Sequence, residues 1–414
     1  MEINNQKTFE RTLEGLRGLA ALFVILYHVI VLDRFPLDPA FKPSGIWGYS
    51  APGHSSVLVF FMLSGLVIGI STKDQLKGPK ISTYVKKRFI RIYPIYLFAI
   101  LLSIFFVSKI DWEQVRYHLF FLHVPFKAVF NNNGSLWSLN YEIFYYTLFI
   151  GFSYFKIEAK WIISLLVFFI SLSFLFAKSI FLHDLILGYS IGLLFWIIGY
   201  YISQMERKDE TYPSNHLLAL IFLWMSLEFF NTFSPIYASY LEDFKKNVYL
   251  FFRIVNYSDL FFLPFCFILL VIACNKNVKY YKYLLILVFI LPLPVFIHKT
   301  FVNPIVFTNR AFFFPSLFYV LSIIILFGKQ IKFKVPEFLN WFGGISYAAY
   351  AIHVPILALF KEFDILSGSL LTYIIRLILF LSLVLGISYV LEKKMQPYVK
   401  RLLMRSSDSL KYNV

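Results

Sequence analysis

The chain has 414 residues, of which 59% are hydrophobic, 21% aromatic and only 15% charged. A soluble domain usually carries charge on about a quarter of its residues, so this composition excludes an ordinary soluble domain and indicates a membrane protein. The two cysteines, Cys266 and Cys274, lie in one apolar run. This placement predicts neither a disulfide framework nor a metal site.

Apolar runs long enough to be candidate membrane spans recur along the whole chain. The run at 284–297 contains two prolines and could be re-entrant, so we predict an all-α, polytopic membrane helix bundle of about 10–12 transmembrane helices. The candidate runs lie near residues 16–32, 56–71, 92–108, 138–155, 161–177, 185–203, 217–233, 259–274, 284–297, 312–328, 341–360 and 369–391.

The distribution of basic residues predicts the orientation of these spans. When the N-terminus is placed in the cytoplasm and sides alternate, the inner segments contain most of the lysines and arginines. The positive-inside rule then places both termini in the cytoplasm. Orientation therefore explains the net charge of +16, and nucleic acid is not an expected partner, whereas membrane lipids are. We expect one membrane domain over 1–400 and a basic cytoplasmic tail over 401–414.

The first span, residues 11–32, carries Arg17 near one end and His28 near the other. On a helix their offset is about three turns, which places them on one side and roughly 16 Å apart. Ionisable residues inside a membrane are costly and usually functional. The alternative is that Arg17 anchors the helix at the interface and His28 is a packed residue.

The second span contains the sequence FFMLSGLVI, with Ser64 and Gly65 at its centre. Small residues inside a membrane helix allow a neighbouring backbone to approach closely, so both residues are predicted to be structural or to line a substrate path. A catalytic role for Ser64 is disfavoured because no nucleophile-elbow sequence surrounds it.

The segment before the third span is strongly basic. Residues 84–91 are predicted to form a basic interfacial helix, and the third span is predicted to start at Tyr93-Pro94. Arg88 and Arg91 are three residues apart and therefore adjacent on one helical face. Two neighbouring guanidinium groups suit phosphate oxygens. The alternative is that they only set the orientation of the chain.

The fourth span opens with GSLWSLNYEIFYYTLF. Trp137 is predicted to be an interfacial aromatic residue, and Ser138 a helix N-cap. Glu142 lies one turn inside the apolar segment and is expected to point into the bundle. In the predicted topology His28 and Glu142 lie at a similar depth, and an imidazole held by a carboxylate is a plausible general base.

The last third contains LNWFGGISYAAYAIHVPI. Gly343 and Gly344 are predicted to mark a bend or a close helix contact. Tyr350 and His353 follow on the helix, and a second membrane histidine supports a polar interior. Like Trp137 and Ser138, they are predicted to be structural or to line a substrate path.

These segments together resemble the acyltransferase 3 family of integral membrane acyltransferases, which includes bacterial glycan O-acetyltransferases. The motifs occur in the family's order and reach both ends of the chain, although Glu14 and the ending around Glu392 depart from the usual pattern and are given no role. The segments that carry the resemblance are LEGLRGLAALFVILYH, FFMLSG, RFIRIYP, WSLNYEIFYY, GISYAAYAIHVPI and LEKKMQPY. We expect no fused esterase-like domain of the kind that some members carry.

The resemblance implies transfer of an acyl group, most often acetyl, from cytoplasmic acyl-CoA to a hydroxyl of a surface or secreted glycan such as O-antigen, capsule or exopolysaccharide. It implies acyl-CoA as a co-substrate with no bound cofactor, and location in a bacterial inner (plasma) membrane. His28 would be the general base, Glu142 a candidate acid that orients it, and Arg17 a stabiliser of negative charge or part of the donor path. Arg88 and Arg91 would bind the phosphates of the donor.

A transporter or flippase of lipid-linked sugars is the alternative from another functional class, because it would also need a polar interior. The two functions differ in one simple property. An acyltransferase consumes acyl-CoA and releases a thiol, whereas a transporter does not.

Overall fold

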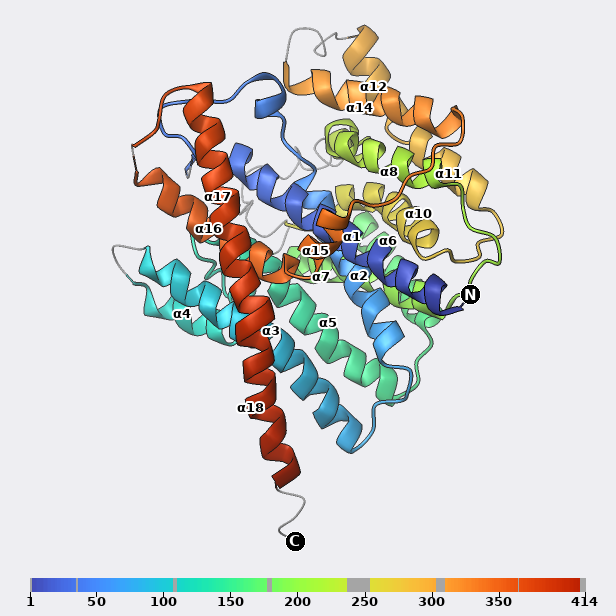
Figure 1. The fold of residues 1–414 in the computed structure, drawn as a ribbon. Helices are drawn as coiled ribbons and strands as arrows, with labels where there is room; N and C mark the ends of the chain where they lie inside the picture. Colours follow the sequence, from blue (N-terminus) through green and yellow to red (C-terminus); the bar gives the residue numbers. More distant parts are fainter. Residues whose placement is uncertain are drawn as a thin grey trace. The chain divides into compact units, whose positions relative to one another are not determined.

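The computed structural model describes residues 2–34, 36–106, 110–176, 181–236, 254–302, 310–363 and 365–409. In these ranges every named element is a helix (Figure 1), and one isolated antiparallel bridge joins Arg207 and Lys276. The predicted all-α class is confirmed.

Seven described helical stretches are long and apolar enough to cross a membrane, and a bent pair of helices would make an eighth. The polytopic prediction is confirmed. Even the lower end of the predicted range, ten, would require at least two of three shorter apolar helices in the described residues to span as well; these are Ala159–Ser173, Tyr257–Ala273 and Ala311–Phe327. The orientation of the termini stays a prediction. The seven stretches are Arg11–Val31, Gly53–Ser71, Pro79–Phe105, Asp184–Gln204, Ser214–Ile236, Tyr281–Val302 and Leu370–Leu403.

The chain divides into two compact units, each assembled from three separate segments. The first unit comprises Met1–Tyr27, Ser44–Lys73 and Ile157–Asn340. The second comprises His28–Pro43, Asp74–Lys156 and Trp341–Val414.

The first unit is built around the packing of α2 (Gly53–Ser71) against α7 (Phe181–Gln204). A Cβ atom at Gly65 would lie 1.8 Å from the carbonyl oxygen of Trp196, and one at Gly199 would lie 1.8 Å from that of Met62. The close backbone approach expected at Gly65 is therefore present, with a glycine on each helix. The unit also contains most of α1 (Glu2–Val31), η1 (Gly45–Gly48), α6 (Ala159–Phe176), α8 (Ser214–Leu227), η3 (Glu228–Phe230), η5 (Tyr257–Phe262), α10 (Leu263–Ala273), α11 (Tyr281–Ile290), α12 (Leu293–Ile297), η6 (His298–Val302) and α14 (Arg310–Phe327).

The second unit is built around α16 (Ser346–Lys361), which packs against α3 (Pro79–Phe105), α17 (Leu370–Val390) and the short η2 (Gly134–Leu136). A π-helical turn, η7 (Leu391–Met395), connects α17 to α18 (Gln396–Ser409), and the three form one long helical run (Figure 1). The unit also contains the last turn of α1, α4 (Trp112–Leu119) and α5 (Trp137–Tyr154). Of the predicted tail, residues 401–409 continue α18, and residues 410–414 lie outside the described ranges.

Two local predictions about helices can be compared directly with the structure. The chain bends by 79° between α15 (Glu337–Gly343) and α16, so the bend predicted at Gly343 and Gly344 is confirmed. The separate interfacial helix predicted before Tyr93-Pro94 is wrong, because α3 runs without a break from Pro79 through Pro94 to Phe105. Membrane helices tolerate an internal proline when neighbouring groups satisfy the freed backbone.

Candidate active site

The second unit contains a pair of histidines that are far apart in the sequence. His28 lies in the last turn of α1, and its Nδ1 is 2.9 Å from Nε2 of His353 on α16. The ring centroids are 4.9 Å apart. His353 is fully buried, whereas His28 is half-buried. The structure thus brings together the two membrane histidines that the sequence placed on separate spans.

The contacts of His353 fix where the protons lie if both rings are neutral. Its Nδ1 is 2.7 Å from the carbonyl oxygen of Tyr350, and because a carbonyl can only accept, Nδ1 must carry the hydrogen. Nε2 of His353 then has a lone pair and accepts the hydrogen on Nδ1 of His28. The basic lone pair of His28 is consequently at its Nε2, an assignment that rests on the hydrogen-bond partners.

Tyr350 connects α16, the helix that carries His353, to the start of α5. Its hydroxyl is 2.6 Å from the carbonyl oxygen of Ser135, to which it must donate its only hydrogen. The hydroxyl of Ser138 is 2.7 Å from the Tyr350 hydroxyl, so Ser138 is the donor of that bond. The predicted N-cap role of Ser138 is wrong: η2 leads directly into α5, whose N-cap position is Leu136.

Pro355 explains a further contact to the same helix. Proline has no N–H, so the carbonyl of Ala351, four residues earlier, lacks its usual helical donor. The side-chain amide of Asn133 lies 3.2 Å from that carbonyl and also 2.9 Å from the hydroxyl of Ser103. The hydroxyl of Ser135 donates to Asn133 Oδ1 at 2.8 Å. Asn133 was not predicted from the sequence, although a proline in an apolar helix and an asparagine-rich turn were both visible.

Glu142, the acid proposed to orient His28, is half-buried on α5. It accepts a hydrogen bond from the hydroxyl of Tyr146, one helical turn further along. His28 also has a ring partner, His353. A contact between His28 and Glu142 stays a prediction.

Arg88 lies against two aromatic rings. The carbon of its guanidinium group is 5.6 Å from the ring centroid of Tyr84, which is on the same helix, and 5.6 Å from that of Tyr146 on α5. A cation held between ring faces is stabilised by their quadrupoles. Aromatic rings therefore lie against Arg88 on the basic face predicted for α3.

Arg91 forms an ion pair that links α3 to η7. Its Nη1 is 2.6 Å from Oε2 of Glu392 and 3.0 Å from Oε1 of Gln396. The side chain of Glu392 is 1% exposed and that of Arg91 is 39% exposed. Glu392, which received no role from the sequence, is thus the carboxylate partner of Arg91.

The remaining predicted residues lie as follows. Trp137 packs edge-to-face on Tyr141, with ring centroids 5.2 Å apart. Arg17 is half-buried on the part of α1 that belongs to the first unit. Ser64, also in the first unit, accepts a hydrogen bond from Nε1 of Trp196 at 3.3 Å.

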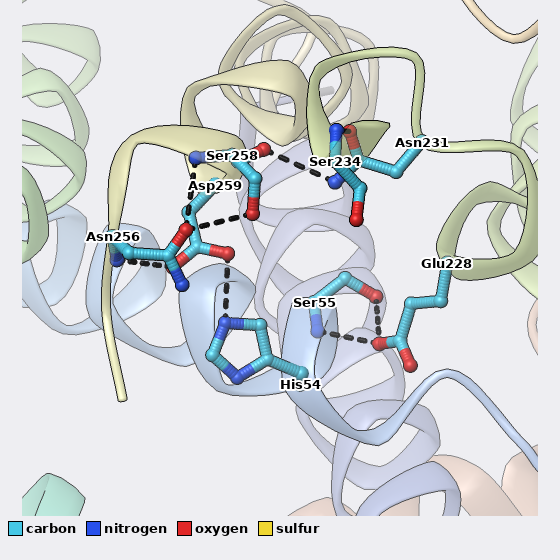
Figure 2. A network of polar contacts seen from close by, with 8 residues as sticks. All are labelled: His54, Ser55, Glu228, Asn231, Ser234, Asn256, Ser258 and Asp259. Carbon is cyan, nitrogen blue, oxygen red and sulfur yellow. Dashed lines mark hydrogen bonds and ion pairs between the residues drawn. The ribbon is translucent and has the colours of Figure 1, made fainter. Parts of the chain in front are cut away.

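The first unit contains a second polar cluster, shown in Figure 2, at the start of α2. Nε2 of His54 is 2.8 Å from Oδ1 of Asp259, whose side chain is 2% exposed. Oε1 of Glu228 accepts from both the backbone N–H and the hydroxyl of Ser55, at 2.7 and 2.8 Å. These contacts join α2 to η5 and η3. The sequence signals only part of this cluster, through the capping-box spacing of Asn256 and Asp259.

Within the described part of the chain, histidine, cysteine, aspartate and glutamate side chains form no group of three or more that could hold a metal ion.

Comparison with known proteins gives partial matches. An acyltransferase from Streptomyces mycarofaciens, MdmB, is 34% identical over 22% of this chain and 22% of its own length. A protein of Acidianus two-tailed virus whose name includes acetyltransferase is 28% identical over 34% of this chain and 40% of its own. Protein 2 in the picA locus of Rhizobium radiobacter is 33% identical over 23% of this chain and 44% of its own length. The chain spans less than half the length of each of these relatives.

No solved structure matches the chain. The family model described as an acyltransferase domain matches residues 10–291, which is more than half of the sequence. This match contains both the RTLEGLRGLAALFVILYH segment and the WSLNYEIFYY segment. The chain therefore belongs to the acyltransferase 3 family.

Proposed function

We propose that this protein is a membrane acyltransferase that moves an acyl group, with acetyl expected, from acyl-CoA to a hydroxyl group of a surface or secreted glycan. Family membership supports the reaction class. The observation that carries the proposal is the histidine pair, because it leaves the basic lone pair of His28 at Nε2. A positioned imidazole is the commonest general base in proteins.

In the proposed reaction, Nε2 of His28 removes the proton from the acceptor hydroxyl. The resulting oxygen attacks the thioester carbonyl and forms the new ester, while the carbon–sulfur bond breaks. The thiolate of CoA takes the proton back from His28 as it leaves, so the enzyme returns to its starting state. Arg17 is proposed to stabilise negative charge or to line the donor path.

Arg88 and Arg91 are proposed to bind the phosphates of acyl-CoA at the cytoplasmic side. Their environments support this role, because Arg88 is oriented by two rings and Arg91 by Glu392. Arg91 is 39% exposed, and a guanidinium has more N–H donors than one carboxylate and one amide oxygen use. Glu142 is proposed as a candidate for a neighbouring acid that helps to orient His28.

The acceptor class and the location come from the family resemblance. We propose a glycan or lipid-linked glycan acceptor presented on the outer side of a bacterial inner membrane. The apolar helices support contact with membrane lipids.

The decisive test is release of free thiol from acetyl-CoA by the purified protein in nanodiscs, with and without a crude glycan extract. We expect glycan-stimulated release by the wild type and a loss of about 10²-fold or more in His28→Ala, because a positioned base typically contributes that much. Wild-type rates from a folded His28→Ala protein would exclude the base assignment. No release with any acyl-CoA, from folded wild type, would favour the transporter or flippase of lipid-linked sugars.

A further inference from the structure

We propose that His353 is a positioning residue that holds His28 in the tautomer with hydrogen on Nδ1 and the lone pair on Nε2. The inference deepens the proposed function and rests on it, because it names what makes His28 a base. It also differs from the sequence prediction, in which a carboxylate would hold the imidazole.

The Tyr350 carbonyl fixes the direction of both hydrogen bonds that His353 makes. Because the Tyr350 carbonyl can only accept, it commits Nδ1 of His353 to donate at 2.7 Å. Nε2 of the same ring must then accept from His28 at 2.9 Å. An unconstrained histidine side chain in water prefers hydrogen on Nε2, so this contact selects the less favoured tautomer.

The surroundings of His353 hold its ring in place. Its side chain is 0% exposed, and its partner carbonyl belongs to Tyr350, whose own hydroxyl is fixed by Ser135. Two residues before His353, the Ala351 carbonyl accepts a hydrogen bond from Asn133. A ring held at both nitrogens and anchored to η2 and α5 can hold His28 in one orientation.

Protonation of His28 strengthens the hydrogen bond between the two rings. When His28 takes up a proton at Nε2, its Nδ1–H becomes a donor of a charge-assisted hydrogen bond to the neutral Nε2 of His353. No proton needs to move between the two rings. The pair can therefore orient the base and stabilise its protonated form.

Two variants of similar size separate the contact with His28 from the contact with Tyr350. In His353→Asn the side-chain amide reaches the position of the original Nδ1 and can still donate to the Tyr350 carbonyl, but it is too short to reach His28. In His353→Gln the carboxamide reaches the position of the original Nε2 and can still accept from His28. The same two substitutions at His216, a half-buried histidine of α8 in the first unit, are matched controls.

The experiment combines ¹⁵N NMR of histidine-labelled protein in nanodiscs with acyl-CoA kinetics. We expect the wild-type and His353→Gln proteins to show a protonated Nδ1 and an unprotonated Nε2 at His28, and His353→Asn to lose that pattern. We expect kcat of His353→Asn to fall about 10²-fold, within the range that a positioned base contributes, with the KM for acyl-CoA unchanged. His353→Gln should recover much of kcat, and the His216 variants should match the wild type.

A His28 tautomer that persists in folded His353→Asn would overturn the inference, as would equal losses of kcat in the Asn and Gln variants. The NMR readout does not depend on turnover. If the wild type consumes no acyl-CoA but His28 still changes tautomer in His353→Asn, the positioning role stands and the proposed acyltransferase function fails.

Discussion

Individual polar residues in the second unit have defined structural tasks, and Asn133 is the clearest. It is fully buried and bonds to Ala351, Ser103 and Ser135. We expect Asn133→Ala to lower the free energy of unfolding by about 1–3 kcal/mol, because the buried Ala351 carbonyl would lose its donor. Thermal unfolding in detergent measures this effect. The exposed neighbour Asn131 provides the control, and an equal loss in Asn131→Ala would contradict the assignment.

Asp38 lies outside the membrane spans, and its pKa predicts how the stability of the fold depends on pH. Burial acts to raise the pKa of Asp38, but hydrogen bonds from Ser367, Ala40, Gly368 and Thr372 together lower it. A carboxylate with a lowered pKa stabilises the fold above its ordinary pKa, and this contribution is lost as the pH falls through the lowered value.

We therefore expect Asp38→Asn to lower Tm at pH 7 and to differ less from the wild type below about pH 4. Melting curves across this pH range provide the measurement. Asp33→Asn is the control because the Asp33 side chain is 85% exposed. A Tm difference for Asp38→Asn that stays constant with pH would mean that the charge of Asp38 is not responsible.

At the scale of helices, the α2–α7 contact depends on Gly65 and Gly199. An added Cβ at Gly65 would meet the carbonyl of Trp196 at 1.8 Å, so the helices must separate to admit even alanine. We expect Gly65→Ala to lower Tm and the folded yield. Gly386→Ala on α17 is the matched control, since nothing lies within 4 Å of its added Cβ. Similar losses for both variants would show that the close contact is not the cause.

Variants of the ion pair between Arg91 on α3 and Glu392 on η7 can separate an effect on stability from an effect on donor binding. We expect Arg91→Ala to destabilise the protein, because it leaves the buried carboxylate of Glu392 without its cation. Adding Glu392→Gln should restore Tm, whereas the KM for acyl-CoA should stay raised if Arg91 binds phosphate. Recovery of both properties in the double variant would limit Arg91 to a structural role.

The sequence predicts helices better than it predicts their polar contacts. The span patterns, the bend at Gly344 and the small-residue contact at Gly65 follow from local sequence and hydrophobicity. Ser138 was misassigned because its partner, Tyr350, is 212 residues away. His28 and His353 were each selected as candidates, but their pairing depends on tertiary packing that no local pattern encodes.

At the scale of the whole molecule, the orientation of the chain is the main prediction to test. Both native cysteines are buried, which favours low background in labelling experiments. We expect a cysteine at the exposed Lys42 to react with an impermeant maleimide added to intact cells, and one at the exposed Lys77 to react only after permeabilisation. The reverse pattern would invert the topology and place the proposed phosphate-binding arginines outside.

The sequence distance between the two histidines has a consequence for biosynthesis. His28 leaves the ribosome early, but its partner follows 325 residues later. A nascent chain or a fragment that ends before α16 lacks His353 and cannot form this histidine pair. If His28 is the proposed base, catalytic competence would therefore appear only after α16 has been synthesised, and shorter chains would not consume acyl-CoA in the membrane.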